Sequence, residues 1–209
     1  MKEKSRLGIL VSGNGTNLQA ILDAADKPDY PAEVAMVVSN VPKALALDRA
    51  GKKGIPTALV PHQKHSSRED FENEMIQHLD RVGVHLVVLA GFMRVLSPTF
   101  IRHYRNRILN IHPALLPAFP GTHAIQQAWD YGVKVTGVTV HFVNEGTDTG
   151  PIILQKELPL QEGEDLKKLE ERIHTIEHQL YPEAIRLFCE RKLEIKGRKV
   201  FIGKTQGAS

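Results

Sequence analysis

The feature that most constrains the fold is an alternation of short apolar runs with helical stretches through the first half of the chain. Five apolar runs have the length and residue types of strands: residues 6–11, 33–38, 56–60, 85–90 and 107–111. Three intervening stretches have helical spacing or helix boundary signals: residues 16–25, 44–53 and 67–81. This alternation predicts a parallel sheet with helices on both faces, because parallel strands are joined by crossover helices.

The second half of the chain has a different pattern. Residues 133–143 are rich in valine and threonine, and we expect them to pair with residues 152–158 as a hairpin. Residues 166–189 predict a long amphipathic helix, which Pro182 should kink or break. Residues 193–202 predict a small edge hairpin. The expected fold class is α/β, a single Rossmann-like, doubly wound and mostly parallel sheet with an antiparallel addition in the C-terminal half.

Composition narrows the class of protein further. With 209 residues, 42% of them hydrophobic and 24% charged, the chain fits one globular domain over residues 1–209. Its single cysteine, Cys189, excludes an internal disulfide framework and a cysteine-rich zinc module. The net charge of +3 is too small to argue for a nucleic-acid partner. The longest apolar run, residues 86–93, is too short to span a bilayer and the N-terminal run is too short for a signal peptide, so we expect a cytoplasmic protein with no membrane partner.

Polar and glycine-rich segments follow several of the expected strands, where α/β sheets bind their ligands: residues 12–17, 91–97, 110–121 and 144–150. In the first segment, Gly13 and Gly15 precede a helix, which suits either a phosphate at the helix N-terminus or a simple tight turn. Leu18 stands at the third glycine position of a dinucleotide fingerprint, and Ser39 and Asn40 stand where its acidic residue would be. A monophosphate therefore fits better than a pyrophosphate.

Two later segments carry residues suited to acyl chemistry. Asn110 and His112 are two residues apart near a strand end, so their side chains are expected on one side of the strand. The amide could stabilise an oxyanion and the imidazole could move a proton. Asp148, in a glycine-flanked loop, could fix the tautomer of the imidazole. The alternatives are a hydrogen-bonded structural histidine and an aspartate that only shapes a turn.

Four motifs occur together in this order: residues 12–21 (SGNGTNLQAI), 90–94 (AGFMR), 110–117 (NIHPALLP) and 148–151 (DTGP). The set resembles the phosphoribosylglycinamide formyltransferases, folate-dependent enzymes of purine synthesis, over about residues 7–193. The resemblance implies transfer of a formyl group from 10-formyltetrahydrofolate to the amine of glycinamide ribonucleotide on the way to IMP. It implies no metal and no covalent enzyme intermediate. The expected partners are these small molecules, bound by a monomer or a homodimer.

The resemblance also implies roles for individual residues. The residues that match the catalytic trio of the family are Asn110, His112 and Asp148. In the N-terminal half, the loop that holds the substrate's phosphate corresponds to the backbone of Gly15, Thr16 and Asn17. The carboxylate that contacts the ribose corresponds to Glu177. The folate site falls on Arg68, Met93, Arg94 and Leu96, and on the backbone of the loop that runs from Asn144 to Asp148.

Two other functions compete with this interpretation. The sequence from His174 to His178 matches the H-x-x-E-H signature of inverted zinc proteases, with Glu177 inside it. Two histidines four apart share a helix face, but zinc needs a third ligand that nothing in the sequence singles out. A binding module is suggested by a basic tail: Arg191, Lys192, Lys196, Arg198 and Lys199. Acidic residues dilute this patch, so a solvated edge hairpin is the favoured interpretation.

Overall fold

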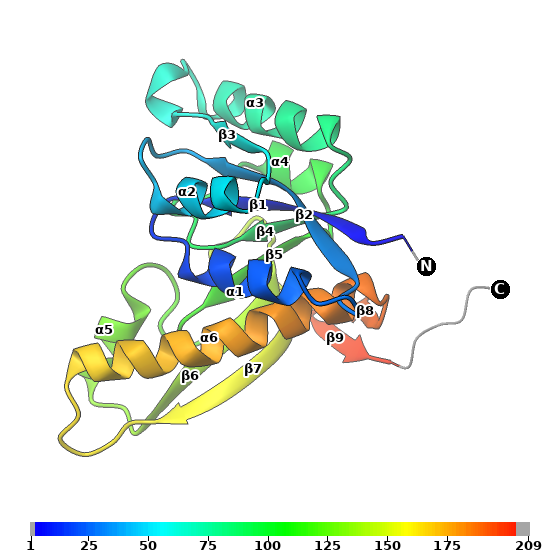
Figure 1. The fold of residues 1–209 in the computed structure, drawn as a ribbon. Helices are drawn as coiled ribbons and strands as arrows, with labels where there is room; N and C mark the ends of the chain where they lie inside the picture. Colours follow the sequence, from blue (N-terminus) through cyan, green and yellow to red (C-terminus); the bar gives the residue numbers. More distant parts are fainter. Residues whose placement is uncertain (1–2, 204–209) are drawn as a thin grey trace. The chain divides into compact units, whose positions relative to one another are not determined.

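The computed structural model describes residues 3–203, and the chain divides after Leu109 into two compact units. The alternation predicted for the first half is confirmed (Figure 1). The elements of the first unit are β1 (Ser5–Val11), α1 (Thr16–Ala25), β2 (Ala32–Ser39), α2 (Leu45–Lys52), β3 (Thr57–Leu59), the 3₁₀ helix η1 (His62–Lys64), α3 (Arg68–Arg81), β4 (Leu86–Leu89) and α4 (Pro98–His103). The interpretation of residues 1–209 as one domain stays a prediction.

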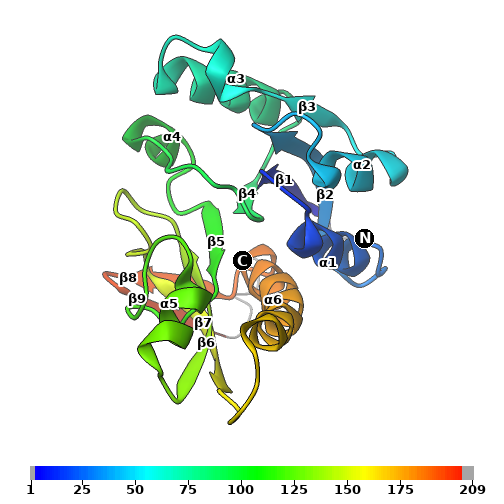
Figure 2. The same cartoon turned by 90° about the vertical axis from the view of Figure 1, so that its left-hand side faces the viewer.

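The sheet of the first unit is parallel, with strand order β3-β2-β1-β4. The order reverses direction after β3, which places a topological switch point at β1 and β4. Helices α1 and α2 lie on one face of this sheet, and α3 and α4 lie on the other (Figure 2). Strand β1 is therefore buried from both sides, and Leu7, Ile9 and Leu10 have no exposed surface. Burial on both faces of the sheet explains why the strands of this half are near-continuous apolar runs in the sequence.

Local signals explain where the helices of this unit begin. The predicted cap of α3 is confirmed, because the hydroxyl of Ser67 accepts a hydrogen bond from the amide of Asp70 at 3.0 Å. Helix α4 was not predicted, since six residues are too few to show helical periodicity. Its start nevertheless carries a signal in the sequence, with Ser97 as the cap and Pro98 in the first turn.

The second unit contains the antiparallel strands. Strand β5 (Ile108–His112) contains the boundary between the units, and the later elements are α5 (Ala124–Tyr131), β6 (Val135–Phe142), β7 (Ile152–Pro159), α6 (Leu166–Cys189), β8 (Leu193–Lys196) and β9 (Lys199–Ile202). The strand order is β5-β6-β7-β9-β8, and the β6–β7 and β8–β9 pairs are antiparallel as predicted. Helix α6 packs along β6 and β7 (Figure 1). The predicted fold class is confirmed.

Of the two outcomes predicted at Pro182, the break is wrong, because α6 runs without interruption from Leu166 to Cys189, and the kink stays a prediction. Proline removes one backbone hydrogen bond from a helix. Tyr181, Ala184 and Ile185, on both sides of the proline, are completely buried. Their packing holds the helical path where the backbone bond is lost. No helix within residues 3–203 has the length and apolar character needed to cross a membrane.

Candidate active site

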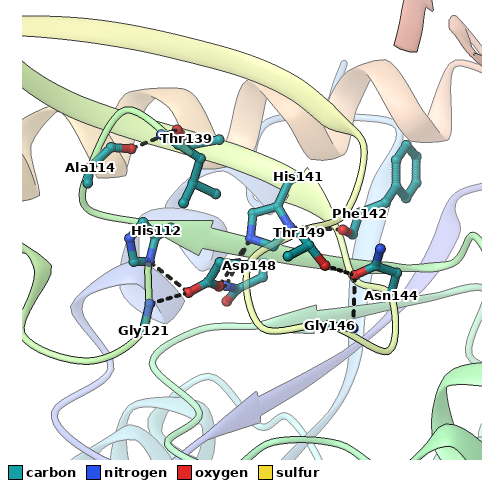
Figure 3. Close-up of polar contacts among 12 residues, drawn as sticks. His112, Ala114, Gly121, Thr139, His141, Phe142, Asn144, Gly146, Asp148 and Thr149 are labelled. Carbon is teal, nitrogen blue, oxygen red and sulfur yellow. Dashed lines mark hydrogen bonds and ion pairs between the residues drawn. The ribbon is translucent and has the colours of Figure 1, made fainter. Parts of the chain in front are cut away.

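The structure brings the three expected catalytic side chains together within the second unit, and two of them, His112 and Asp148, are labelled in Figure 3. Asn110 and His112 lie on β5, and Asp148 lies in the loop between β6 and β7 (residues 143–151), which we call the β6–β7 loop. The amide nitrogen of Asn110 donates to Oδ1 of Asp148 at 3.3 Å, and Nδ1 of His112 lies 3.4 Å from Oδ2. The backbone amide of Gly121 also donates to Oδ2, at 2.8 Å. One carboxylate thus contacts an amide, an imidazole and a backbone N–H.

The β6–β7 loop is shaped by its own residues. Oδ1 of Asn144 accepts hydrogen bonds from the amide of Gly146 at 3.3 Å and from the hydroxyl of Thr149 at 2.8 Å (Figure 3). A Cβ atom at Gly150 would lie 1.6 Å from the carbonyl oxygen of Phe142, so only glycine fits there. The side chain of Asn144 is therefore used inside the loop, and its predicted folate contact remains a prediction.

Asp148 itself has a left-handed backbone, with φ of 52°. Few residues other than glycine, asparagine and aspartate adopt this conformation without strain. Such strain persists where the surrounding structure fixes it, and it is typical of functional sites. The loop therefore directs this carboxylate toward β5 at a small conformational cost.

Burial and hydrogen bonding oppose each other at Asp148. Burial would raise the pKa of this carboxyl, because it penalises the charged form. The imidazole of His141, the amide of Gly121 and the charge of His112 favour the carboxylate more strongly, so the pKa of Asp148 falls below its ordinary value. The group is consequently an anion at neutral pH, and it can hold a proton donor in place.

Both ring nitrogens of His112 face acceptors. Nε2 lies 2.8 Å from the carbonyl oxygen of Phe119, which requires an N–H at that position, and Nδ1 faces the carboxylate of Asp148. The side chain is only 5% exposed. The imidazolium form satisfies both acceptors, because it carries a proton on each nitrogen.

His141 is a fourth member of the cluster that the sequence reasoning missed. It lies on β6 and is buried, and its Nδ1 donates to the carbonyl oxygen of Phe142 at 2.8 Å. Its Nε2 lies 3.3 Å from the amide nitrogen of Asn110 and 3.5 Å from Oδ1 of Asp148. The signal that could have found it is a histidine at the end of a valine- and threonine-rich strand, directly before the Asp148 loop.

Glu177, the expected ribose contact, lies on α6 and is buried. Its Oε2 is 2.8 Å from Nδ1 of His174, and this hydrogen bond raises the pKa of His174 although burial acts in the opposite direction. The rings of His174 and His178 stack with their centroids 6.4 Å apart. Within residues 3–203, no group of three or more His, Cys, Asp or Glu side chains is arranged to hold a metal ion, so the zinc alternative gains no support.

The expected phosphate residues lie in the first unit, at the start of α1. No side chain caps this helix and no acidic residue lies in its first turn, in contrast to α3 with its Ser67 cap. Gly15 is left-handed, with φ of 72°, and an added Cβ would lie 2.7 Å from that of Ala46. Gly15 at the N-cap thus supplies no side-chain acceptor to the start of the helix, an arrangement that favours an anion there.

A cation beside this turn was also missed by the sequence reasoning. Nε of Arg49 donates to the carbonyl oxygen of Asn14 at 2.8 Å, and Nη1 donates to the side chain of Gln19 at 3.1 Å. Arg49 lies on α2, and nothing in the helical pattern of that stretch distinguishes it from other exposed basic residues. Its position next to the loop between β1 and α1 (residues 12–15), which we call the β1–α1 loop, adds positive charge there.

The expected folate residues of the first unit gather between α3 and the loop from β4 to α4 (residues 90–97), which we call the β4–α4 loop. The guanidinium of Arg68 approaches the carbonyl oxygen of Val95 at 3.5 Å, and that of Arg94 lies 5.9 Å from the ring centroid of Phe71. Met93 is 72% exposed, whereas Leu96 is buried. Leu96 therefore offers a ligand its backbone groups rather than its side chain.

The chain is similar to several known proteins over most of its length. A family model described as formyl transferase matches residues 5–185. A phosphoribosylglycinamide formyltransferase from Escherichia coli (strain K12) is 43% identical over 187 residues, which cover 90% of this chain and 88% of that protein. A solved structure of glycinamide ribonucleotide transformylase 1 from Symbiobacterium toebii has a TM-score of 0.95 and 47% identity, covering 98% of this chain and 96% of that one.

Some relatives are much longer than this chain. The trifunctional purine biosynthetic protein adenosine-3 of Homo sapiens is 40% identical over 194 residues, which are 93% of this chain but 19% of that protein. The chain spans about a fifth or less of the length of the trifunctional relatives that it matches.

Proposed function

Since the chain belongs to the formyl transferase family, we propose that it transfers a formyl group from 10-formyltetrahydrofolate to the amine of glycinamide ribonucleotide in purine biosynthesis. The observation that carries the proposal is the contact of Asn110 and His112 with the carboxylate of Asp148. This set combines an oxyanion donor, a proton carrier and a fixed anion. Those are the groups that acyl transfer to an amine requires.

In the proposed reaction, the amine nitrogen of the ribonucleotide attacks the formyl carbon and forms the new C–N bond. The carbonyl electrons move to the oxygen, and the bond from the formyl carbon to the donor nitrogen then breaks. The amine loses one proton and the donor nitrogen gains one. The enzyme must therefore stabilise a transient oxyanion and transfer a proton.

Asn110 is proposed to stabilise the oxyanion. Its amide nitrogen lies 3.3 Å from Nε2 of His141 and 3.3 Å from Oδ1 of Asp148, and in the proposed reaction one N–H keeps the contact with Asp148 while the second turns to the formyl oxygen. Removal of such a donor typically lowers turnover by about 10²–10³-fold. His141 is buried and bonded to the backbone, so it helps to keep the amide in this orientation.

His112 is proposed to assist the proton transfers, with Asp148 holding its charged form. For Nε2 to reach the reacting groups, it must exchange the carbonyl oxygen of Phe119 for the substrate. General acid–base assistance of this kind is worth about 10²–10⁴-fold in rate.

The substrate-binding residues complete the proposal. The uncapped start of α1 at Gly15, Thr16 and Asn17 binds the phosphate, and Glu177 binds the ribose. The formyl donor binds at Arg68, Met93, Arg94 and Leu96. It also binds at the backbone of the β6–β7 loop from Asn144 to Asp148. Exposed apolar side chains support this assignment, since Met93 is 72% and Val95 is 60% exposed on one short loop, as an aromatic ligand would require.

The proposal is tested by the initial rate of deformylation of 10-formyltetrahydrofolate, measured with and without glycinamide ribonucleotide. We expect a rate that requires the ribonucleotide and yields its formylated product. A rate that does not depend on the ribonucleotide would instead indicate a hydrolase or another acceptor. In the same assay, Asn110→Ala and His112→Ala should reduce turnover far more than they weaken folate binding, and near-wild-type turnover in either variant would remove its assigned role.

A further inference from the structure

The β1–α1 and β4–α4 loops of the first unit are joined by a single residue, Ser12. Its backbone amide donates to the carbonyl oxygen of Gly91 at 3.1 Å. Its hydroxyl accepts from the backbone amide of Met93 at 3.0 Å and donates to Oδ1 of Asn40 at 2.7 Å. All three bonds link segments that are at least 28 residues apart in the sequence. Ser12 thus connects the ends of three parallel strands.

Asn40, which follows β2, orients the hydroxyl of Ser12. It is 3% exposed, and its amide nitrogen lies 3.4 Å from Nδ1 of His62. A dinucleotide-binding fold uses an acidic side chain in this part of the chain to hold a ribose. Here the side-chain amide of Asn40 occupies that position and contacts Ser12 and His62 of the protein itself. Because Oδ1 of Asn40 accepts the proton of the Ser12 hydroxyl, the lone pairs of that hydroxyl point to the amide of Met93.

We propose that Ser12 and Asn40 are positioning residues that couple the binding of the two substrates, so that each substrate increases the affinity of the other. The inference rests on the proposed function, which assigns the ribonucleotide phosphate to the end of the β1–α1 loop and the folate to the β4–α4 loop. Ser12 touches neither ligand in this assignment. Its effect is transmitted through the backbone positions of Gly15 and Met93.

The physical basis is a shared set of hydrogen bonds. A phosphate at the start of α1 would order the β1–α1 loop, and the hydroxyl of Ser12 would then hold the amide of Met93 in one place. The folate would then bind to a β4–α4 loop whose conformation is already fixed. Its binding would carry a smaller entropy cost for ordering this loop. The same coupling must act in the reverse direction, because binding free energies are reciprocal.

The far end of the β4–α4 loop has a separate support. The buried carboxylate of Glu72 accepts a hydrogen bond from the amide of Ser97 at 2.8 Å and a second one from its hydroxyl. This support lies on α3 and has no bond to the β1–α1 loop among those described. The loop is therefore held at two ends, and only the end at Met93 is connected to Ser12.

The test uses glycinamide ribonucleotide and tetrahydrofolate, a pair that cannot react because neither carries a formyl group. The dissociation constant of tetrahydrofolate is measured by calorimetry with and without saturating ribonucleotide, and the ratio is the coupling factor. Couplings between ligands are commonly about 5–150-fold. We expect at least about 5-fold for the wild type, and a factor near one for Ser12→Ala and Asn40→Ala.

Matched variants separate coupling from a general structural effect. Ser39→Ala removes a completely buried hydroxyl next to Asn40. Within residues 3–203 this hydroxyl is bonded to the backbone of Val41 at 3.1 Å and not to Ser12, so the variant should keep the wild-type coupling factor. Ser12→Thr retains the hydroxyl and should restore the coupling. The double variant of Ser12 and Asn40 should lose no more coupling than Ser12→Ala alone, because Ser12→Ala already removes the bonds of the hydroxyl to both Asn40 and Met93.

The outcomes are distinguishable. A wild-type coupling factor of one, or an unchanged factor in Ser12→Ala, overturns the inference while the proposed function stands. If Ser12→Ala does not fold, Asn40→Ala decides by the same criterion. A folded wild-type protein that binds neither ligand overturns the proposed function itself.

Discussion

The cluster around Asp148 and the loops around Ser12 use polar side chains in opposite ways. In the second unit, Asp148 contacts Asn110, His112 and His141, and the side chains themselves are the proposed chemical groups. In the first unit, the proposed contacts to the phosphate are backbone amides, and Leu96 offers its backbone to the proposed folate. The hydroxyl of Ser12 bonds to the amide of Met93, and thereby only sets where the backbone lies.

This difference predicts how each region responds to substitution. A side chain that performs chemistry is lost when it is replaced, so turnover falls while the fold persists. A backbone amide is not removed by substitution and is only displaced through its supports. Changes in the first unit should therefore alter affinity, coupling and stability more than they alter the chemical step.

The largest effect is expected for Asp148→Asn. Asparagine tolerates the left-handed backbone at this position, so the β6–β7 loop should keep its shape. It lacks the negative charge that faces His112 and His141, and we expect kcat to fall by about 10³-fold. Tetrahydrofolate affinity and melting temperature should change little. A kcat within about tenfold of the wild type would contradict the assignment of Asp148.

The next effect is expected for Gly15→Ala in the first unit. Alanine at φ of 72° costs about 1–2 kcal/mol, and its Cβ would crowd Ala46 at 2.7 Å. We expect KM for the ribonucleotide to rise by about tenfold, with a smaller change in kcat. Gly13→Ala is the matched comparison, because a Cβ there meets nothing within 4 Å and the rise in KM should be smaller. Equal effects of the two variants would contradict this explanation.

A smaller effect, on the free energy of unfolding as well as on KM, is expected when Glu72, which supports the β4–α4 loop, is replaced. Glu72→Ala removes the acceptor for the buried amide and hydroxyl of Ser97. We expect a loss of about 1–3 kcal/mol in the free energy of unfolding, measured by urea titration. KM for the formyl donor should rise more than KM for the ribonucleotide. Glu69→Ala, an exposed residue of the same helix, is the control and should leave both quantities nearly unchanged.

The smallest effect concerns pH and the pair of His174 with Glu177. Because the hydrogen bond to Glu177 raises the pKa of His174, folding favours the protonated imidazole. The stabilisation is complete below the unfolded pKa of about 6.5, and it is lost as the pH rises through the folded pKa. The melting temperature of His174→Gln should therefore fall further below that of the wild type at pH 5.5 than at pH 9, by about a few degrees. A difference that is larger at pH 9 would contradict the sign.

The sequence predicted the regular elements best where their periodicity was long. Residues 16–25 and 166–189 were predicted as helices with the bounds that α1 and α6 have, because many apolar positions define each stripe. Helix α4 was missed and the bounds of α5 were not predicted, since six and eight residues do not establish a period. The break at Pro182 was wrong because tertiary packing overrides the local cost of proline.

The candidate site was predictable to the extent that it lies in contiguous motifs. Asn110 and His112 share a strand end, and the glycines around Asp148 mark its loop. His141 carried only its position directly before the Asp148 loop as a signal and Arg49 carried none, because the contacts of both depend on elements that are far apart in sequence. The bond of Ser12 to Asn40 has the same character, since it spans 28 residues and requires adjacent parallel strands.

The left-handed backbone of Asp148 has a consequence for how this position can change over time. Asparagine is the replacement that this backbone accepts with least strain, whereas glutamate would keep the charge but pay for the conformation and for an extra methylene. The substitution most acceptable to the backbone is thus the one that we expect to slow the proposed reaction most. A lineage that drifted through asparagine at this position would keep the shape of the β6–β7 loop while losing most of the proposed turnover.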